Sequence, residues 1–315
     1  MSPTASPDTA ARPGTAAARP GTAAAPPAQA PQPATTARAA RRPRLPRSAG
    51  AYAVMVVSVL VLGVPLIWMV LASFKQPAEL YNLPLQWLPA NPDLSNYAEA
   101  MSLVPMVRMF LNSVGLTLVG ATLELLFGLC CAYALVFIDF PFKRAIFVGV
   151  LFTLLIPQQI TIIPNYTLVA ELGWINSYHG ILVPGLASAF GTFLFRQHFL
   201  TLPTSILEAA GLDGANDWRK LWQFIVPMSA PTIAAVAVIS LVAKWNEYLW
   251  PFLVTDDPEK MTLPVGLTLL QKVDGMQDWG LLMAATTLVT VPMIVVFLVL
   301  QRRLVAGLTA GAVTG

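Results

Sequence analysis

Long runs of apolar residues alternate with short polar segments along most of this chain. A helix needs about 20 mostly apolar residues to cross a bilayer. The hydropathy pattern predicts six such spans, each ending where charge, Pro or Gly begins: Ala51 to Phe74, Met109 to Ile138, Ala145 to Ala170, Ile181 to Phe195, Met228 to Val254 and Trp279 to Leu300. The pattern therefore predicts an all-α membrane protein with six transmembrane helices, multi-pass in the cell membrane.

The segment ahead of the first span has a different composition. Residues 1–50 are a mixture of Ala, Pro, Thr and Arg whose only large apolar side chains are Met1 and Leu45. So few apolar groups cannot offset the entropy lost on ordering, which predicts a disordered tail over 1–50 and a membrane domain over 51–315. The tail has no apolar region followed by a small-residue cleavage site, so the first span is expected to direct insertion itself.

The positions of Lys and Arg predict the orientation, because these residues are enriched in cytoplasmic loops. If the N-terminus is cytoplasmic, 14 of the 19 Lys and Arg residues fall inside. Both termini are then cytoplasmic, and so is the polar segment between the fourth and fifth spans. Cys130 and Cys131 are expected to be packing residues, and His179 and His198 lie at opposite ends of the fourth span, so no metal site is predicted.

The polar segment contains the stretch "EAAGLDGANDW", Glu208 to Trp218, in a chain with only 11% charged residues. "SILE", Ser205 to Glu208, fits a capping box that would begin a helix, and Gly214 can adopt the left-handed conformation that ends one. The segment is therefore expected to be a helix of about two turns, roughly 204–216. Its apolar and small residues exceed what a simple connection needs, which indicates a cytoplasmic partner, whereas Asp213 and Asp217 are expected to be solvated.

This segment carries a specific resemblance. "EAAGLDGANDWRKLWQFIVP" resembles the cytoplasmic EAA motif of ABC-importer permeases, with matches at Glu208, Ala209, Ala210, Gly214 and Pro227. The blocks "SFKQPAEL", "NYAEA", "NSVGLT", "WNEYLWPFL", "TLPVGL" and "GLTAGAVTG" follow in the order and spacing of the carbohydrate-uptake (maltose-type, MalG-like) branch. Thr314 stands where that family usually has Lys, which puts a charge-dependent role of the C-terminal tail in doubt.

The resemblance implies the ABC type I importer permease fold and a set of partners. A homologous second permease would complete the pore, two copies of a cytoplasmic ABC ATPase would hold ATP and Mg, and an extracytoplasmic sugar-binding lipoprotein would deliver the sugar. It also implies that the helix bearing Glu208, Ala209, Ala210, Asp213 and Gly214 couples the permease to the ATPase. A purely structural role of Glu208 in the capping box remains an alternative, and the two roles are compatible.

The chain itself is not expected to be an enzyme. None of its six lysines follows a Gly, so the phosphate-binding G-x-x-x-x-G-K-[ST] loop is missing. Energy must then come from a partner, no cofactor of this chain is predicted, and no nucleic-acid partner is expected.

Two polar segments within the spans are candidates for the transport path. In "LIPQQITIIPNYTL", Pro157 and Pro164 interrupt the helix near Gln158, Asn165 and Tyr166, and freed backbone groups are tolerated only where protein or water satisfies them. The equal alternative is hydrogen bonding between subunits. In "KWNEYLW", Lys244 and Glu247 are expected on one helical face beside Asn246 and Tyr248, lining a cavity. The alternative is an interfacial belt formed by the aromatic residues Trp245, Tyr248 and Trp250.

These observations favour a sugar-importing permease subunit over two other classes of protein. An ion-coupled secondary transporter could use intramembrane Glu124 or Glu247 for proton coupling, but it does not explain the EAA segment and would favour an internal inverted repeat, which is not seen. A membrane scaffold or receptor accounts for none of the family blocks. The identity of the sugar lies outside the sequence.

Overall fold

The computed structural model describes residues 49–271 and 278–310 of the 315-residue chain. All regular elements in these residues are helical, in agreement with the predicted all-α class. Contacts group the chain into two units, Met1–Val54 and Met55–Gly315. Residues 49–54 begin helix α1, and the rest of α1 and all later elements lie in the second unit. The predicted tail falls outside the described residues apart from its last two, and Thr314 falls outside them as well.

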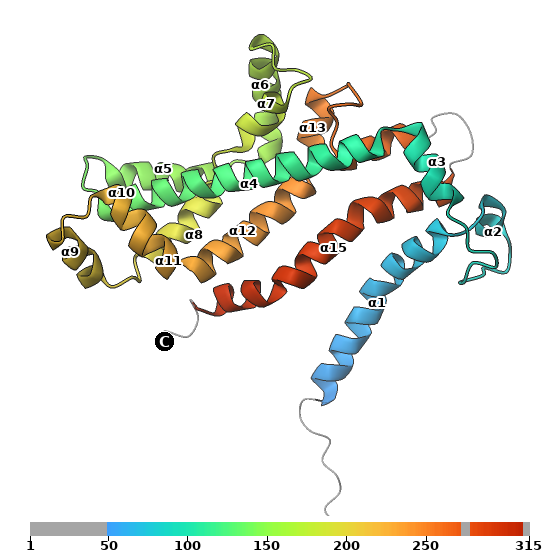
Figure 1. Ribbon diagram of the computed structural model, residues 1–315, viewed down its shortest axis with the longest axis horizontal. Helices are drawn as coiled ribbons and strands as arrows, with labels where there is room; N and C mark the ends of the chain where they lie inside the picture. Colours follow the sequence, from blue (N-terminus) through green and yellow to red (C-terminus); the bar gives the residue numbers. More distant parts are fainter. Residues whose placement is uncertain (1–48, 272–277, 311–315) are drawn as a thin grey trace, which may run out of the picture. The chain divides into compact units, whose positions relative to one another are not determined.

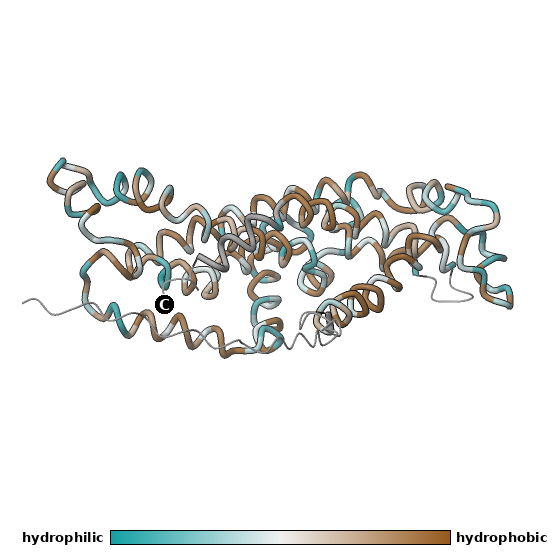
Figure 2. The backbone as a smooth tube through the Cα atoms, turned by 90° about the horizontal axis from the view of Figure 1, so that it is seen from below, coloured by the Kyte–Doolittle hydropathy of each residue, from teal (hydrophilic) through white to brown (hydrophobic). Residues whose placement is uncertain are grey.

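Within the described residues, three helices are long and apolar enough to cross a membrane without a break (Figure 1). They are α1 (Ala49–Ser73), α4 (Met106–Phe137) and α15 (Trp279–Ala310). α1 and α4 cover the first and second predicted spans except for the last residue of each, and α15 contains the sixth. Pro65 and Pro292 lie inside α1 and α15 without ending them. Figure 2 shows that long hydrophobic stretches of the chain alternate with short hydrophilic ones, as expected for segments that enter and leave a bilayer.

The other three predicted spans are bent. The sequence predicts an interruption of the third span near Pro157 and Pro164, and a bend is present at Pro157, whereas the bends at the fourth and fifth spans are not predicted. α5 (Lys143–Leu155) and α6 (Gln158–Glu171) meet at 100°. The segment Tyr178–Gly185, made of α7 (Tyr178–Leu182) and the 3₁₀ helix η1 (Val183–Gly185), meets α8 (Ala189–Phe199) at 42°. Asp217–Met228 meets α12 (Ala230–Trp245) at 84°. If each pair is one span, the described residues hold up to six.

The 100° bend follows from the chemistry of proline. Pro157 disfavours helical backbone at the preceding residue, and Ile156 is extended, with φ −81° and ψ 116°. Pro157 is then the N-cap of α6, where its missing N–H costs no hydrogen bond. Pro164, the second predicted breaker, lies inside α6 and does not end it.

The fifth predicted span ends early for a related reason. α12 stops at Trp245, a turn follows, and a separate short helix, α13, covers Leu249–Val254. Pro251 cannot lie in the interior of a helix without clashing with the carbonyl of the residue four positions earlier, Glu247. It is tolerated in the first turn of α13, and Glu247 lies in the turn between α12 and α13.

Short helices complete the connections: α2 (Pro77–Tyr81), α3 (Ser95–Leu103), α9 (Thr204–Leu212), α10 (Asp217–Lys220), a π-helix (Leu221–Ile225), α11 (Val226–Met228), α14 (Leu263–Gly266) and the 3₁₀ helix η3 (Leu267–Leu270). After α1 the fully buried Lys75 donates a hydrogen bond to the carbonyl of Gln86, and its ammonium lies 4.6 Å from the ring centroid of Trp68. These contacts fix the start of the connection to α3.

The core that positions the candidate site is built on α4, which packs against α8 and α12, while α12 also packs against α15 (Figure 1). One buried cluster joins Leu129 and Tyr133 of α4, Phe195 and Phe199 of α8, and Val236 of α12. The cluster also includes Leu207 of α9, so the polar segment that precedes α12 is packed onto the long helices.

Candidate functional site

The first part of the site is helix α9, which carries the EAA stretch. The predicted two-turn helix is present as Thr204–Leu212, and Gly214 follows it with φ +79°. The N–H of Ala215 donates to the carbonyl of Ala210 at 2.9 Å, and the N–H of Gly214 donates to the carbonyl of Gly211 at 3.1 Å. This pair of bonds is the Schellman motif, which satisfies the last carbonyls of a helix and requires a left-handed residue. The predicted role of Gly214 in ending the helix is confirmed.

The start of α9 differs from the prediction. Its N-cap is Pro203, without a side-chain capping bond, and the first helical residue is Thr204. Ser205 therefore lies inside the first turn, and Glu208 lies five residues after the cap instead of three. The predicted capping box is wrong because the chain enters the helix from Pro203, whose fixed φ of −67° favours helix initiation immediately after it. Glu208 is not needed to hold the helix start.

The two faces of α9 differ in burial. Leu207 and Ala210 are buried against the rest of the chain. Glu208 and Ala209 are exposed, and Leu212 on the next turn is 91% exposed. Asp213 and Gly214 are also exposed at the end of the helix. Of the five residues expected at an ATPase contact, only Ala210 faces inward, where its carbonyl also accepts the Schellman bond.

The turn after α9 is tied to α4. Asn216 is the N-cap of α10, and its side-chain oxygen accepts a 2.8 Å hydrogen bond from the N–H of Arg219. The hydroxyl of Tyr133, on α4, donates to Oδ1 of Asp217 at 3.1 Å. Asp217 was expected to be solvated, and that prediction is incomplete because the carboxylate, although exposed, also accepts a bond from a buried tyrosine. Sequence gives no signal for this pairing, since the partners are 84 residues apart.

The second part of the site is a cavity of about 720 Å³, within the range of 300–1,000 Å³ typical of small-molecule sites. Its wall comes from α4, from the bends between α5 and α6 and between α7 and α8, and from the turn between α12 and α13. Gln158, Asn165 and Glu247, three of the predicted path residues, line it. Tyr166, Asn246 and Tyr248 are not among its lining residues; the ring of Tyr248 stacks on Phe252, with centroids 5.4 Å apart.

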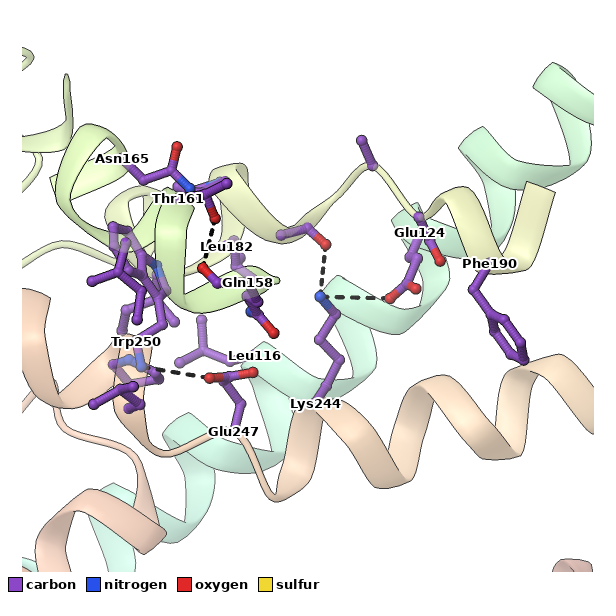
Figure 3. Close-up of a pocket in the computed structure, with 18 of the residues that line it drawn as sticks. Leu116, Glu124, Gln158, Thr161, Asn165, Leu182, Phe190, Lys244, Glu247 and Trp250 are labelled. Carbon is purple, nitrogen blue, oxygen red and sulfur yellow. Dashed lines mark hydrogen bonds and ion pairs between the residues drawn. The ribbon is translucent and has the colours of Figure 1, made fainter. Parts of the chain in front are cut away.

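Lys244 and Glu124 form an ion pair in the wall of the cavity (Figure 3). The ammonium of Lys244 lies 3.5 Å from Oε2 of Glu124 and donates a 2.6 Å hydrogen bond to the carbonyl of Gly185. Both charged side chains are largely shielded, at 23% and 14% exposure. A Cβ on Gly185 would lie 2.9 Å from the ammonium, so the absence of a side chain allows this approach. One lysine thereby joins α12, α4 and the end of η1.

Glu247 does not share a helical face with Lys244, contrary to the prediction, because α12 ends at Trp245. Its Oε1 accepts a long, 3.5 Å hydrogen bond from the N–H of Trp250 at the start of α13. Figure 3 shows the carboxylate on the side of the cavity near Leu116. The indole N–H groups are occupied: Trp245 donates to the carbonyl of Val289 at 3.1 Å, and Trp250 donates to that of Gly180 at 3.0 Å. These two tryptophans are buried around the cavity, while Tyr248 alone of the predicted belt is exposed.

Several lining residues were not selected from the sequence. They are neutral or aromatic, and they include Ser113 and Thr117 of α4, Thr161 of α6, Gly185 and Ser188 at the bend before α8, and Phe190 in the first turn of α8. The available signal was the run "VPGLASAFG", whose Pro, Gly and Ser residues predict an interruption of the fourth span. The hydroxyl of Ser188 accepts a 3.1 Å bond from the N–H of Gly191 and so begins α8 at the bend.

Comparisons with known proteins agree with these features. Residues 124–310 match the protein family described as "Binding-protein-dependent transport system inner membrane component". Among curated relatives, the sn-glycerol-3-phosphate transport system permease protein UgpE of Agrobacterium fabrum is 33% identical over 266 residues, which cover 82% of this chain and 94% of that protein. The protein of the same name from Rhizobium meliloti is 32% identical over 262 residues, covering 81% and 93%.

Two solved structures share the fold. One is a chain of a bacterial ABC transporter involved in the import of the acidic polysaccharide alginate, with a TM-score of 0.71, 24% identity, and coverage of 83% of this chain and 99% of that chain. The other comes from the bacterial alginate transporter in complex with an alginate pentasaccharide-bound periplasmic protein, with a TM-score of 0.55 and 16% identity over 81% and 93%. At these identities the likeness supports the fold alone.

Proposed function

Because this chain belongs to the family of binding-protein-dependent transport system inner membrane components, we propose that it forms half of a pore that imports a sugar or sugar-like solute. It is a permease subunit of an ABC importer and is located in the inner membrane. Its role is transport, and it is not an enzyme. The ion-coupled alternative built on Glu124 or Glu247 is not favoured, because the matching family and the UgpE relatives are components of binding-protein-dependent transport systems. At Glu124 the ammonium of Lys244 also pairs with the carboxylate.

The partners in this proposal follow from the family. A homologous second permease completes the pore, two copies of a separate ABC ATPase bind ATP and Mg, and an extracytoplasmic sugar-binding lipoprotein delivers the cargo. The tail and both termini lie in the cytoplasm, on the same side as α9, which the excess of Lys and Arg on that side supports.

The observation that carries the proposal is the mechanical connection from α9 to the cavity. The exposed residues Glu208, Ala209 and Leu212 provide a surface for the ATPase. On the other face Leu207 belongs to the buried cluster that holds together α4, α8 and α12. The same three helices contribute Glu124, Phe190 and Lys244 to the cavity wall. A displacement of α9 by the ATPase would therefore move the helices that line the cavity.

The lining supports a sugar as cargo. Hydroxyl groups both donate and accept hydrogen bonds, and the amides of Gln158 and Asn165 supply a donor and an acceptor each. Sugar rings present apolar faces that pack on aromatic side chains, and Phe190 and Trp250 line the same cavity. A volume of about 720 Å³ is sufficient for a small saccharide.

Uptake assays test this proposal. The complete transporter, expressed with its binding protein and ATPase in cells that lack other sugar importers, should accumulate at least one radiolabelled saccharide from a broad panel. Replacement of the Lys in the phosphate-binding G-x-x-x-x-G-K-[ST] loop of the ATPase should abolish that uptake. Accumulation that persists in this variant, or the absence of uptake of every saccharide by an assembled complex, would contradict the proposal.

A further inference from the structure

The charged side chains that line the cavity differ in whether they have a partner of opposite charge. Among the described residues that line it, three are ionisable, namely Glu124, Lys244 and Glu247, which give a formal charge of −1 when all are ionised. Two are carboxylates and one is an ammonium, so the cavity contains a single cationic group from the described part of this chain.

That cationic group is already engaged. Lys244 is held between the carboxylate of Glu124, at 3.5 Å, and the carbonyl of Gly185, at 2.6 Å. Its methylene groups also pass close to α4, since a Cβ on Gly120 would lie 3.7 Å from Cδ of Lys244. An anion entering the cavity would have to compete with Glu124 for this ammonium.

Glu247 is in the opposite situation. Its only described polar partner is the N–H of Trp250 at 3.5 Å, and no described Lys, Arg or His lies within the 4.0 Å that defines an ion pair. A carboxylate that is only partly exposed and lacks a cation retains acceptor capacity toward the cavity. Hydroxyl donors of a cargo can satisfy it through charge-assisted hydrogen bonds, which are stronger than neutral ones.

We infer that this cavity selects cargo that carries no negative charge. Glu247 is the specificity-determining residue, and the ion pair between Lys244 and Glu124 keeps the ammonium from binding an anionic cargo. The inference rests on the proposed function and narrows its substrate class to neutral polyhydroxylated solutes, with cationic amino sugars also admitted. A phosphate or uronate group would lose its hydration without gaining a cation, and it would face repulsion from Glu247. The cargo therefore differs in charge from the sn-glycerol-3-phosphate for which the UgpE relatives are named.

Charged thiol reagents test the inference without reference to any cargo. Asn165→Cys is introduced into an otherwise Cys-free complex, and its reaction rates with a cationic and an anionic methanethiosulfonate of similar size are measured. Each rate is divided by the rate for free cysteine in solution. We expect the normalised cation-to-anion ratio to be about fivefold or more above unity, because a single unpaired charge at the distances found within one cavity is worth about that factor or more. A ratio at or below unity would overturn the inference.

Variants assign the effect to the named charges. Glu247→Gln should lower the ratio towards unity while complex assembly, followed by size-exclusion chromatography, stays unchanged. Glu124→Gln makes the same change in net charge but also releases Lys244, and the double variant with Glu247→Gln should reverse the preference to the anionic reagent. An unaltered ratio in Glu247→Gln would remove that residue from the proposed role.

Uptake distinguishes failure of the inference from failure of the proposed function. The unaltered complex should transport neutral saccharides and exclude their phosphate esters and uronic acids. Transport of an anionic saccharide would support the sugar-import function and overturn the charge selection. If no saccharide is transported and the cationic reagent is still preferred, the charge inference holds and the proposed cargo class is wrong.

Discussion

The hydroxyl of Tyr133 on α4 donates a 3.1 Å hydrogen bond to Oδ1 of Asp217, the first residue of α10. Tyr133 is 4% exposed and belongs to the buried cluster of α4, α8 and α12, whereas Asp217 lies in the polar segment that follows the EAA stretch. The bond therefore connects a helix that lines the cavity to the surface proposed to meet the ATPase, in addition to the apolar contact of Leu207.

Tyr133→Phe should weaken this connection and lower substrate-stimulated ATP hydrolysis by the purified complex. The ring stays in place and only the hydroxyl is lost, so the stability cost should be about 1 kcal/mol. Asp217→Asn keeps an acceptor oxygen and should remain close to the unaltered protein. The same chemical change at Tyr52, which is 64% exposed, serves as the control. Stimulation that is identical in Tyr133→Phe and in the control would show that the bond has no role in coupling.

Gly214 provides a second test, because it adopts φ +79° in the Schellman turn after α9. Gly214→Val should cost about 1–3 kcal/mol of backbone strain, although a Cβ there would meet no atom within 4 Å. The strain should displace α9 and reduce both ATPase association in pull-down assays and uptake. Gly214→Asn is the matched control, because Asn tolerates the left-handed region, and it should retain most activity. Equal loss in both variants would mean that the position requires the smallest residue for another reason.

The features predicted from the sequence are those with a local cause. The continuous helices α1, α4 and α15 follow from long apolar runs, and the end of α9 follows from a glycine after a two-turn amphipathic segment. Bends were harder to place because proline alone does not determine them. Pro157 lies at a bend of 100°, yet Pro164 lies inside a helix only seven residues later.

The features that were missed depend on contacts between distant residues or on competition between neighbours. Lys244 and Glu124 are far apart in the chain, and the residues around each of them do not indicate which residue of opposite charge it will pair with. In the same way, the sequence predicts that the capping box at Ser205 begins α9. Pro203 is the cap in the structure, which moved Glu208 out of the position where a capping box would use it. A helix start that is wrong by one or two residues is enough to change the assigned role of a side chain.

The Lys244–Glu124 pair should stabilise the membrane domain. Lys244→Met leaves a shielded carboxylate without its cation, and the expected loss is about 1–3 kcal/mol, less than for a fully buried pair because both groups are partly exposed to the cavity. Glu124→Gln in the Lys244→Met background removes the orphaned charge and should restore much of the melting temperature measured by thermal shift in detergent. Failure of the double variant to recover would indicate that the bond to Gly185, and not the ion pair, supplies the stability.

The orientation of the chain can be tested at two equally accessible sites. Leu83, between α2 and α3, is 90% exposed, and Leu212, at the end of α9, is 91% exposed. Leu83→Cys should be labelled by a membrane-impermeant maleimide in intact cells or spheroplasts, and Leu212→Cys only after permeabilisation. The Cys-free protein supplies the background. The opposite pattern would refute the orientation inferred from the positions of Lys and Arg.

Glu208 gives the sharpest test of what α9 does, because the structure separates its two possible roles. Glu208 lies on the exposed face of α9, and the cap of the helix is Pro203. Neither Glu208→Gln nor Glu208→Ala should therefore change stability by more than about 0.5 kcal/mol, as is usual for surface substitutions. If the carboxylate binds a basic residue of the ATPase, both variants should lose substrate-stimulated ATP hydrolysis to a similar extent, and the loss should be reproduced by raising the salt concentration for the unaltered complex, since exposed charge pairs are screened. Ser205→Ala, one turn earlier on the same short helix, is the control for a change near the ATPase surface that removes no charge. Loss of stability in Glu208→Ala with full activity in Glu208→Gln would instead restore the structural role and remove the charge from the coupling contact.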